Sequence, residues 1–499
     1  MSERKTAEDW RELAEELEFR TQAYIDGRYV DAESGETFAC INPATGQALA
    51  EIAATDAPDV DAAVAAARRA FDAGHWSRLP PVKRKRCLHK LAMLVREHRE
   101  ELALLETLDM GKPISDSLKV DVPAAANCLD WYAEAIDKVY GEVAPTGDNM
   151  LGLITREPVG VVGAIVPWNF PLLMAAWKLG PALATGNSVV LKPSEKSPLS
   201  AIRLAELASE AGLPEGVLNV LPGFGHTAGQ AIALHEDVDC VAFTGSTRVG
   251  RKLLEYAGQS NMKRVWLECG GKTPNIVLAD CVDLDAAARA STFAIFYNQG
   301  EMCSAGSRLL ADARIKDELL DRIMATAKTL KPGDPLDPAT SMGAIVDQQQ
   351  YATVLRYIAA GTAGGATLRM GGHPAAVGDG GYFIEPTVFD DVRNDMQIAQ
   401  EEIFGPVLST IRFETPDEAV AIANDVLYGL AAAVWTRDVS TAHRLARRLR
   451  AGTVWINCFE EGDLTVPFGG YKQSGIGRDK SLHALEKYTE LKTTWLKLS

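Results

Sequence analysis

Between Val159 and Ala257 the sequence alternates between short apolar strands and longer helical segments, and this alternation limits the possible folds more than any other feature. Repeated βα units of this length predict a parallel sheet with helices on both faces. The expected strands cover 160–166, 188–192, 217–221 and 240–244, and the expected helices cover 172–184, 198–211, a segment from 227, and 248–257.

A second run of alternating elements begins after Glu268. It predicts strands at 275–278 and 307–311 and helices at 285–297, 315–329 and 348–360. The N-terminal part predicts a strand pair, 24–30 with 36–42, turned at Asp26-Gly27, followed by helices at 59–73 and 83–108. The tail 488–498 predicts an extended strand that pairs either within its own chain or with the sheet edge of another subunit.

The composition and charge exclude several classes of protein. A net charge of −16 argues against binding to nucleic acid, because phosphate contacts need a basic surface. The eight cysteines contain no CxxC pair and the eight histidines no HExxH pair, so we expect no metal site and no disulfide framework. At 499 residues the chain is long enough for about three domains.

The sequence predicts a cytoplasmic protein. Its first ten residues are charged and acidic-rich, unlike a signal or transit peptide. The longest apolar region, 159–191, is interrupted by three prolines and Lys178, so no membrane span and no membrane partner is expected.

Cys303 sits in a run of small residues and glycines, directly after an apolar segment. A thiolate is a nucleophile, and small neighbours allow a carbonyl carbon to reach its sulfur. Upstream, Glu268 precedes Gly270 and Gly271 and is a candidate for activating the water that cleaves a covalent thioester. Alternatively, Cys303 is a small buried hydrophobe and Glu268 ends a strand that runs into a turn. Taken together, the two residues favour covalent cysteine catalysis.

Two segments favour a dinucleotide site. Lys192 and Glu195 follow the carboxyl end of an expected strand, where a carboxylate can bind ribose hydroxyls. Residues 245–250 lead from a strand into a helix whose free amides can bind a pyrophosphate. The glycine-rich run 223–229 has the spacing GxGxxxG, one residue longer than a nucleotide fingerprint, and a turn explains it better.

Asn169, held between prolines and aromatic residues, is either an oxyanion donor or part of an ordinary Pro-rich turn.

Seven motifs in order along the chain carry a family resemblance. They are PWNFP (167–171), KPSE (192–195), FTGST (243–247), LECGGK (267–272), the loop ending at Cys303, EEIFGP (401–406) and PFGGYKQSG (467–475). From about 24 to 495 the chain resembles the NAD(P)-dependent aldehyde dehydrogenases. Four further segments look most like the bacterial γ-glutamyl-γ-aminobutyraldehyde dehydrogenases, enzymes of putrescine breakdown: 106–113, 131–143, 260–268 and 477–492.

The resemblance implies a fold of three parts. These are a Rossmann-like NAD-binding domain (1–128 and 159–268), an α/β catalytic domain (269–478) and a small β oligomerisation module (129–158 and 479–499). It also implies a homodimer or homotetramer. The cofactor is expected to be NAD, with NADP accepted less well, because the carboxylate of Glu195 repels a 2′-phosphate.

The resemblance also implies roles for individual residues. Cys303 is expected to be the nucleophile, Glu268 the general base and Asn169 an oxyanion donor, with Lys178 in a proton path. Two positions depart from the family pattern: Glu301, whose charge raises the thiol pKa if it points inward, and Cys269, expected to be harmless packing. The residues expected to contact the dinucleotide are Ile165, Pro167, Trp168, Lys192, Ser194, Glu195, Gly225, Gly245, Ser246, Val249, Glu402 and Phe404.

The loop before Pro467 suggests a substrate, because it carries three acids, Glu460, Glu461 and Asp463. A negatively charged substrate entrance attracts an aldehyde that bears an ammonium group. The alternative is that these acids merely face solvent. The alternatives are a broad-specificity aliphatic or betaine aldehyde dehydrogenase, a cofactor-free thiol esterase, and a catalytically silent protein of the same fold. The expected substrate residues are Phe170, Trp177, Asp109, Asp121, Glu460, Glu461 and Phe468.

Overall fold

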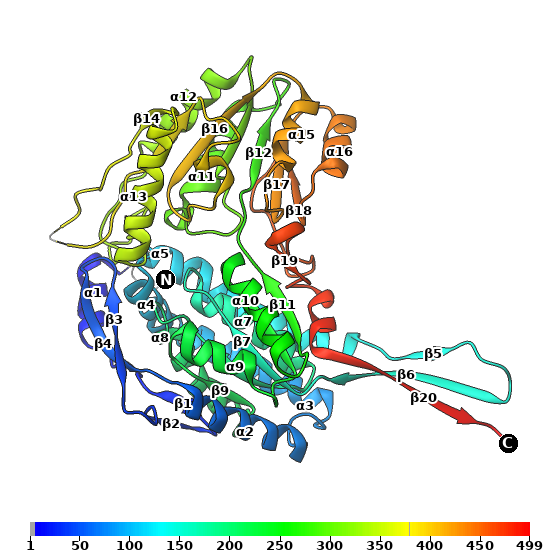
Figure 1. Ribbon diagram of the computed structural model, residues 1–499. Coiled ribbons are helices and arrows are strands. Elements are labelled where there is room, and N and C mark those ends of the chain that lie inside the picture. Colours follow the sequence, from blue (N-terminus) through cyan, green and yellow to red (C-terminus); the bar gives the residue numbers. More distant parts are fainter. Residues whose placement is uncertain (1–4, 379) are drawn as a thin grey trace.

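The computed structural model describes residues 5–378 and 380–499, which form two large sheets, a projecting three-stranded sheet and a two-stranded ribbon (Figure 1). The α/β class predicted from the sequence is confirmed. No helix within the described residues is both long and apolar enough to cross a membrane.

The first sheet has a parallel centre that is buried on both faces. Every residue of its two middle strands is buried, as expected for strands between two helix layers. Its eight strands lie in the order β19 (Gly475–Ile476), β11 (Arg264–Glu268), β10 (Cys240–Thr244), β7 (Val161–Ile165), β8 (Ser188–Lys192), β9 (Leu218–Val220), β1 (Ala23–Ile25) and β2 (Arg28–Val30).

Alternate residues of these strands face opposite helix layers. Val162 and Val189 pack with one layer, whereas Val161 and Val190 pack with the other, as the two-residue period of a strand requires. The first layer contains α3 (Pro81–Glu97), α6 (Val122–Ala135), α7 (Pro171–Ala184) and α8 (Leu199–Ala211), and the second contains α2 (Ala57–Ala73), α9 (Gln230–Leu234) and α10 (Thr247–Gln259).

The second sheet lies above the first in Figure 1. Six of its seven strands run parallel, and only the edge strand β14 pairs in the antiparallel sense. The order is β14 (Thr367–Met370), β15 (Thr387–Asp390), β16 (Val407–Phe413), β13 (Arg308–Asp312), β12 (Pro274–Val277), β17 (Ala431–Trp435) and β18 (Thr453–Ile456). Its helices are α11 (Leu284–Phe296), α12 (Lys316–Ala327), α13 (Gln348–Ala363), α14 (Gln397–Gln400), α15 (Pro416–Asn424) and α16 (Val439–Arg448).

A three-stranded antiparallel arm projects from the body (Figure 1). It consists of β20 (Thr489–Lys497), β6 (Met150–Pro158) and β5 (Glu142–Ala144), in that order. The tail strand β20 therefore pairs within its own chain, over nine residues of β6. Within the described residues its other edge carries no strand.

Two N-terminal predictions were wrong in detail. The helix expected over 83–108 is two helices, α3 and α4 (Arg99–Met110), because His98 adopts φ −93° and ψ 21° between them. Apolar periodicity continues through the break and hides it. The predicted turn at Asp26-Gly27 joins β1 to β2, and both residues have positive φ. The segment expected to pair with it instead pairs with its own neighbour, β3 (Thr37–Asn42) with β4 (Gln47–Ala53).

The division into domains stays a prediction, to which the sheets add two details. The expected boundary at residue 128 falls inside α6, a helix that packs in the core beneath the first sheet. The short strand β19, expected in the catalytic domain, hydrogen-bonds to β11 at the edge of the first sheet. The chain thus returns from the second sheet to the first before it enters the arm.

Candidate active site

The candidate site is a cavity of about 680 Å³ between the carboxyl edge of the first sheet and the loop that carries Cys303. Strand register explains why the site forms here. In the parallel pairs, Ile165 lies level with Lys192, and Thr244 lies level with Glu268. The residues that follow these strands therefore gather at one edge, the usual place for a ligand in a parallel α/β sheet.

A strained turn presents Cys303 to this cavity. Asn298 and Gln299 are left-handed at φ 49° and 57°, and Gly300 follows at φ 75°. Left-handed backbone costs a non-glycine residue about 1–3 kcal/mol and persists where its surroundings fix it. The Gln299 side chain does so here, because it accepts a hydrogen bond from the Gly343 amide at 3.0 Å and donates one to the Ala344 carbonyl at 3.3 Å.

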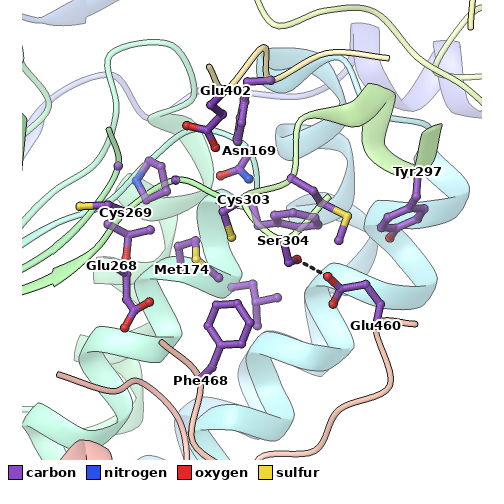
Figure 2. A pocket seen from close by; sticks show the side chains of 18 of the residues that line it. Asn169, Met174, Glu268, Cys269, Tyr297, Cys303, Ser304, Glu402, Glu460 and Phe468 are labelled. Atoms are coloured by element: carbon purple, nitrogen blue, oxygen red, sulfur yellow. Dashed lines mark hydrogen bonds between the residues drawn. The ribbon is translucent and has the colours of Figure 1, made fainter. Parts of the chain in front are cut away.

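Asn169 lies against the same loop. Its buried side-chain amide donates a hydrogen bond to the Glu301 carbonyl at 2.8 Å, two residues before Cys303. Figure 2 shows Asn169 next to the Cys303 thiol, with Glu268 to one side and Ser304 and Glu460 to the other. The three residues expected to catalyse the reaction thus come together around one cavity.

Glu268 ends β11 and is buried, and neither of its carboxylate oxygens has a hydrogen-bond partner among the residues that the structure describes. Burial raises the pKa of Glu268 well above its usual range, and the nearby Asp479 raises it further, against the opposing effect of Lys178, Lys487 and Arg478. A carboxyl group with a raised pKa and free lone pairs has the properties of a general base.

Lys178 lies behind Glu268, in a buried ion cluster. Its ammonium and that of Lys487 both pair with the carboxylate of Asp479, and all three side chains are buried. Burial lowers the pKa of Lys178, partly offset by the charge of Asp479. A neighbouring position must be small, since a Cβ atom at Gly469 would lie 2.6 Å from the Glu268 carboxylate.

Several carboxylates surround the Cys303 thiol. Burial raises its pKa, and the charges of Glu460, Glu402 and Glu268 add to the increase. The thiol therefore needs a base to become a nucleophile. Glu301 does not contribute as the sequence had suggested, because it does not line the cavity and accepts a hydrogen bond from the Val346 amide at 3.1 Å.

Six of the residues expected to contact the dinucleotide line the cavity. Trp168 packs edge-on against Phe404, with ring centroids 5.1 Å apart. Glu402 accepts a hydrogen bond from the Gly271 amide at 3.2 Å, and burial raises its pKa to about 7. The six lining residues are Pro167, Trp168, Gly245, Ser246, Glu402 and Phe404.

The other six expected dinucleotide residues lie along the same sheet edge but outside this cavity. Lys192 is buried, and its ammonium donates to the carbonyls of Pro193 and Gly223 at 2.6 Å. The Val249 amide donates to the side chain of Ser246 at 3.3 Å, so this amide already has an acceptor. The remaining four are Ile165, at the end of β7; Ser194 and Glu195, after β8; and Gly225, whose Cα faces open space.

These features fit a dinucleotide. Ser246 caps α10, a helix of 13 residues, next to Gly245, where the chain leaves β10. A Cβ atom at Gly245 would lie 2.5 Å from the Phe243 ring, and one at Gly270 would lie 1.9 Å from the Glu402 carboxylate, so a larger residue at either position would displace these side chains. Glycines beside a helix N-terminus form the type of cradle that binds a pyrophosphate.

Aromatic side chains line the other end of the cavity. The expected Phe170, Trp177 and Phe468 are in place, and Trp177 packs edge-on against Phe468 with centroids 5.5 Å apart. Sequence reasoning missed Met174, Tyr297 and Trp455, which also line it. Met174 lies one helical turn before Lys178 on α7, but Trp455 lies within β18, in a segment with no recognised motif.

Two expected substrate residues lie elsewhere. Asp109 is fully buried and accepts a hydrogen bond from the Leu199 amide at 3.0 Å, so it fixes the start of α8. Asp121 is also fully buried and pairs with Lys112, whose ammonium lies 4.0 Å from the centre of the Phe170 ring. Neither side chain reaches the cavity. The predicted contribution of both residues to a negative mouth was wrong.

Acidic residues do lie at the aromatic end. Glu460 and Glu461 line the cavity, whereas Asp463 does not. The Ser304 hydroxyl donates a hydrogen bond to Glu460 (Figure 2). Burial raises the pKa of Glu460 to about 6, although Ser304 and Lys480 oppose the increase. Sequence reasoning missed Lys480, which lines the same end.

Comparison with known proteins identifies the family. Residues 29–494 match the model of the Aldehyde dehydrogenase family. The chain belongs to the aldehyde dehydrogenase family. It is 58% identical to the NADP/NAD-dependent aldehyde dehydrogenase PuuC of Escherichia coli over 492 residues, which is 98% of each chain.

Solved structures agree with this assignment. An indole-3-acetaldehyde dehydrogenase in complex with NAD⁺ has a TM-score of 0.98 and 63% identity, over 99% of this chain and all of that one. A γ-glutamyl-γ-aminobutyraldehyde dehydrogenase from Burkholderia cenocepacia has the same TM-score and coverage at 62% identity. This aldehyde dehydrogenase is thus an oxidoreductase that acts on aldehydes with NAD or NADP, and the predicted fold, activity and cofactor are confirmed.

Proposed function

We propose that this aldehyde dehydrogenase oxidises an aminoaldehyde to a carboxylic acid, with Cys303 as nucleophile, Glu268 as general base and Asn169 as oxyanion donor. The observation that carries the proposal is the single cavity shared by these three residues, with a glycine-lined sheet edge on one side and an aromatic, acidic channel on the other. Relatives named for such substrates include the B. cenocepacia enzyme described above.

The first half of the proposed reaction forms a thioester. Glu268 accepts the proton of the Cys303 thiol, and the sulfur attacks the aldehyde carbon. The resulting oxyanion receives hydrogen bonds from the Asn169 side chain and the Cys303 backbone N–H, a type of contact that contributes on the order of 10²–10³ in rate. When bound, the dinucleotide supplies the hydride acceptor for the carbon held on Cys303.

The second half releases the acid. Glu268, with both oxygens free of protein partners, takes a proton from water as the water attacks the thioester. The C–S bond breaks, Cys303 recovers its proton and the carboxylic acid leaves. Lys178 and Asp479 behind Glu268 form the proposed path by which the base loses the proton it has gained.

Glu195 supports a preference for NAD over NADP. It lies after β8, where a carboxylate can accept hydrogen bonds from the ribose hydroxyls. Its nearest cation is Lys192, 3.6 Å away, and the Lys192 ammonium already donates to two carbonyls. A ribose 2′-phosphate at this place would meet an incompletely neutralised carboxylate.

We further propose a homodimer or homotetramer assembled through the arm. The arm exposes apolar side chains that a monomer would leave in water, among them Val143, Leu491, Trp495 and Leu496. The outer edge of β20 also offers backbone groups for pairing. A cytoplasmic location is part of the proposal, since Cys303 must stay a reduced thiol.

One experiment tests the catalytic proposal. Cys303→Ala should abolish NAD-dependent oxidation and hydrolysis of a p-nitrophenyl ester, while NAD binding by calorimetry remains. Cys281→Ala, at a half-buried cysteine outside the cavity, is the matched control and should retain both activities. Esterase activity without any NAD-dependent turnover in the wild type would support the cofactor-free alternative instead.

A further inference from the structure

Lys480 places an ammonium group in the wall of the catalytic cavity. Its side chain is only half-buried, and its ammonium lies 5.7 Å from the centre of the Trp177 ring. Across residues 5–378 and 380–499, no carboxylate lies close enough to form an ion pair with it, although the charges of Glu460 and Asp463 act on it from further away. Because the rest of this aromatic end is apolar or acidic, an unpaired cation here needs an explanation.

The backbone is strained at Lys480 and at Glu460. Lys480 has φ 62° and its neighbour Ser481 has φ 51°, while Glu460, on the loop across the cavity, has φ 56°. Neighbouring hydrogen bonds hold the Lys480 turn, from the Asp479 amide to the Phe468 carbonyl at 2.7 Å and from the Ser481 amide to the Leu464 carbonyl at 2.8 Å. Left-handed backbone is unfavourable for residues other than glycine and is concentrated at ligand sites.

Opposite charges therefore lie together in the wall of one channel. Glu460 is held by Ser304, next to the nucleophile, and Glu461 is exposed to solvent. The same wall carries the aromatic side chains of Trp177, Trp455 and Phe468. A purely cationic aldehyde would be attracted by the acids but repelled by Lys480, so this mouth does not match a simple amine.

We infer that Lys480, together with Glu460 and Glu461, forms a two-charge mouth that recognises an aldehyde whose far end carries both a carboxylate and an ammonium group. Lys480 binds the carboxylate, the acids bind the ammonium, and the aromatic wall contacts the chain between them. This inference rests on the proposed function and narrows its substrate to aldehydes that end in an α-amino acid, the group present in a γ-glutamylated aminoaldehyde. Lys480 is then the specificity-determining residue.

Three aldehydes of different end charge test the inference. They are γ-glutamyl-γ-aminobutyraldehyde with both charges, 4-aminobutyraldehyde with the ammonium alone, and butyraldehyde with neither. In Lys480→Met, kcat/KM for the γ-glutamyl aldehyde should fall about tenfold relative to butyraldehyde, through KM, because a charge-assisted hydrogen bond is lost. The same ratio for 4-aminobutyraldehyde should rise severalfold, because a repulsive charge is removed. Lys480→Arg should keep the wild-type order.

Because the two expected changes in kcat/KM have opposite signs, they distinguish substrate recognition by Lys480 from a general loss of activity. If kcat/KM falls equally for all three aldehydes, Lys480 is structural and the inference is wrong. If kcat/KM for the γ-glutamyl aldehyde relative to butyraldehyde is unchanged, another residue binds the carboxylate and the inference is also wrong. Lys328→Met removes an exposed lysine at the end of α12 and controls for net charge. A wild-type enzyme that prefers butyraldehyde to both amino compounds would overturn the proposed substrate class itself.

Discussion

The side-chain amide of Asn169 donates a hydrogen bond to the backbone carbonyl of Glu301 at 2.8 Å, which joins the loop after β7 to the loop that carries Cys303. Asn298 donates to the same carbonyl, and also to the Asn169 carbonyl, both at 3.2 Å. An asparagine amide has two N–H groups. One fixes the plane of the Asn169 amide, and the second is left for the proposed contact with an oxygen of the substrate.

Asn169→Ala should lower kcat/KM on the order of 10²–10³-fold, because it removes an oxyanion donor. The loss should appear in kcat as well as in kcat/KM, since the contact strengthens in the transition state. NADH formation at 340 nm measures it, and thermal unfolding checks that the fold persists. A loss of less than about fivefold would remove Asn169 from this role.

Glu268→Gln should separate the two halves of the reaction. Water loses its base, so steady-state turnover should fall much further than any initial burst of NADH, measured by stopped flow. A burst and a steady state that fall together would place Glu268 in thiol activation as the limiting step.

The same substitution should change stability with pH. Because the pKa of Glu268 is raised in the folded state, the wild-type protein loses stability as the pH rises above the unfolded-state value near 4.5. Glu268→Gln removes this buried charge, so its melting temperature should exceed that of the wild type by more at pH 8 than at pH 5. Scanning calorimetry at both pH values measures the difference. Equal shifts at the two pH values would contradict the raised pKa.

Much of the site could be predicted from sequence because its residues follow strand ends. Glu268 ends β11 and Lys192 ends β8, and the register of parallel strands brings such ends together. Cys303 was identifiable from the small residues around it. The βα alternation likewise predicts the layers, because it depends on local periodicity alone.

The predictions that failed concern residues whose orientation is set by tertiary packing. Asp109 and Asp121 lie on turns of helix that face the core, and no local pattern shows that a carboxylate is fully buried. The break at His98 lies inside a continuous apolar period. Lys480 was missed because its side chain reaches the cavity only through a left-handed backbone, which its own sequence does not signal.

Glu195→Gln should weaken the preference for NAD. The carboxylate that repels a 2′-phosphate becomes a neutral amide, so kcat/KM with NADP should rise relative to that with NAD. Paired steady-state assays with both cofactors at one ionic strength measure the ratio. Glu236→Gln, at an exposed residue after α9, is the charge control. An unchanged ratio would place cofactor selection in another residue.

Glu301→Gln should stabilise the fold without changing the pH dependence of the Cys303 thiol. Burial raises the pKa of Glu301 well above its usual range, and within the described part of the chain only the Val346 amide donates to its carboxylate. The wild-type protein therefore loses stability as the pH rises through and above 4.5, whereas glutamine keeps the hydrogen bond without the charge. Urea midpoints at pH 5 and 8 should diverge in favour of the variant. The pH dependence of Cys303 alkylation by iodoacetamide should stay the same, and a shift would show that Glu301 acts on the thiol.

Asp479→Asn should destabilise the protein at neutral pH. Burial by itself raises the pKa of Asp479, but Lys178 and Lys487 more than offset it, so the pKa lies below its usual range. The carboxylate therefore contributes stability above pH 3.8 that is lost as the pH falls through the lower folded-state pKa. Removing it at pH 7 leaves two buried ammonium groups without a partner, a change that costs about 3–5 kcal/mol. Urea unfolding measures this difference, and Asp479→Asn combined with Lys487→Met, which deletes one of the two orphaned charges, should recover part of the loss. If the double variant is no more stable than the single one, the cluster is not held together by charge balance.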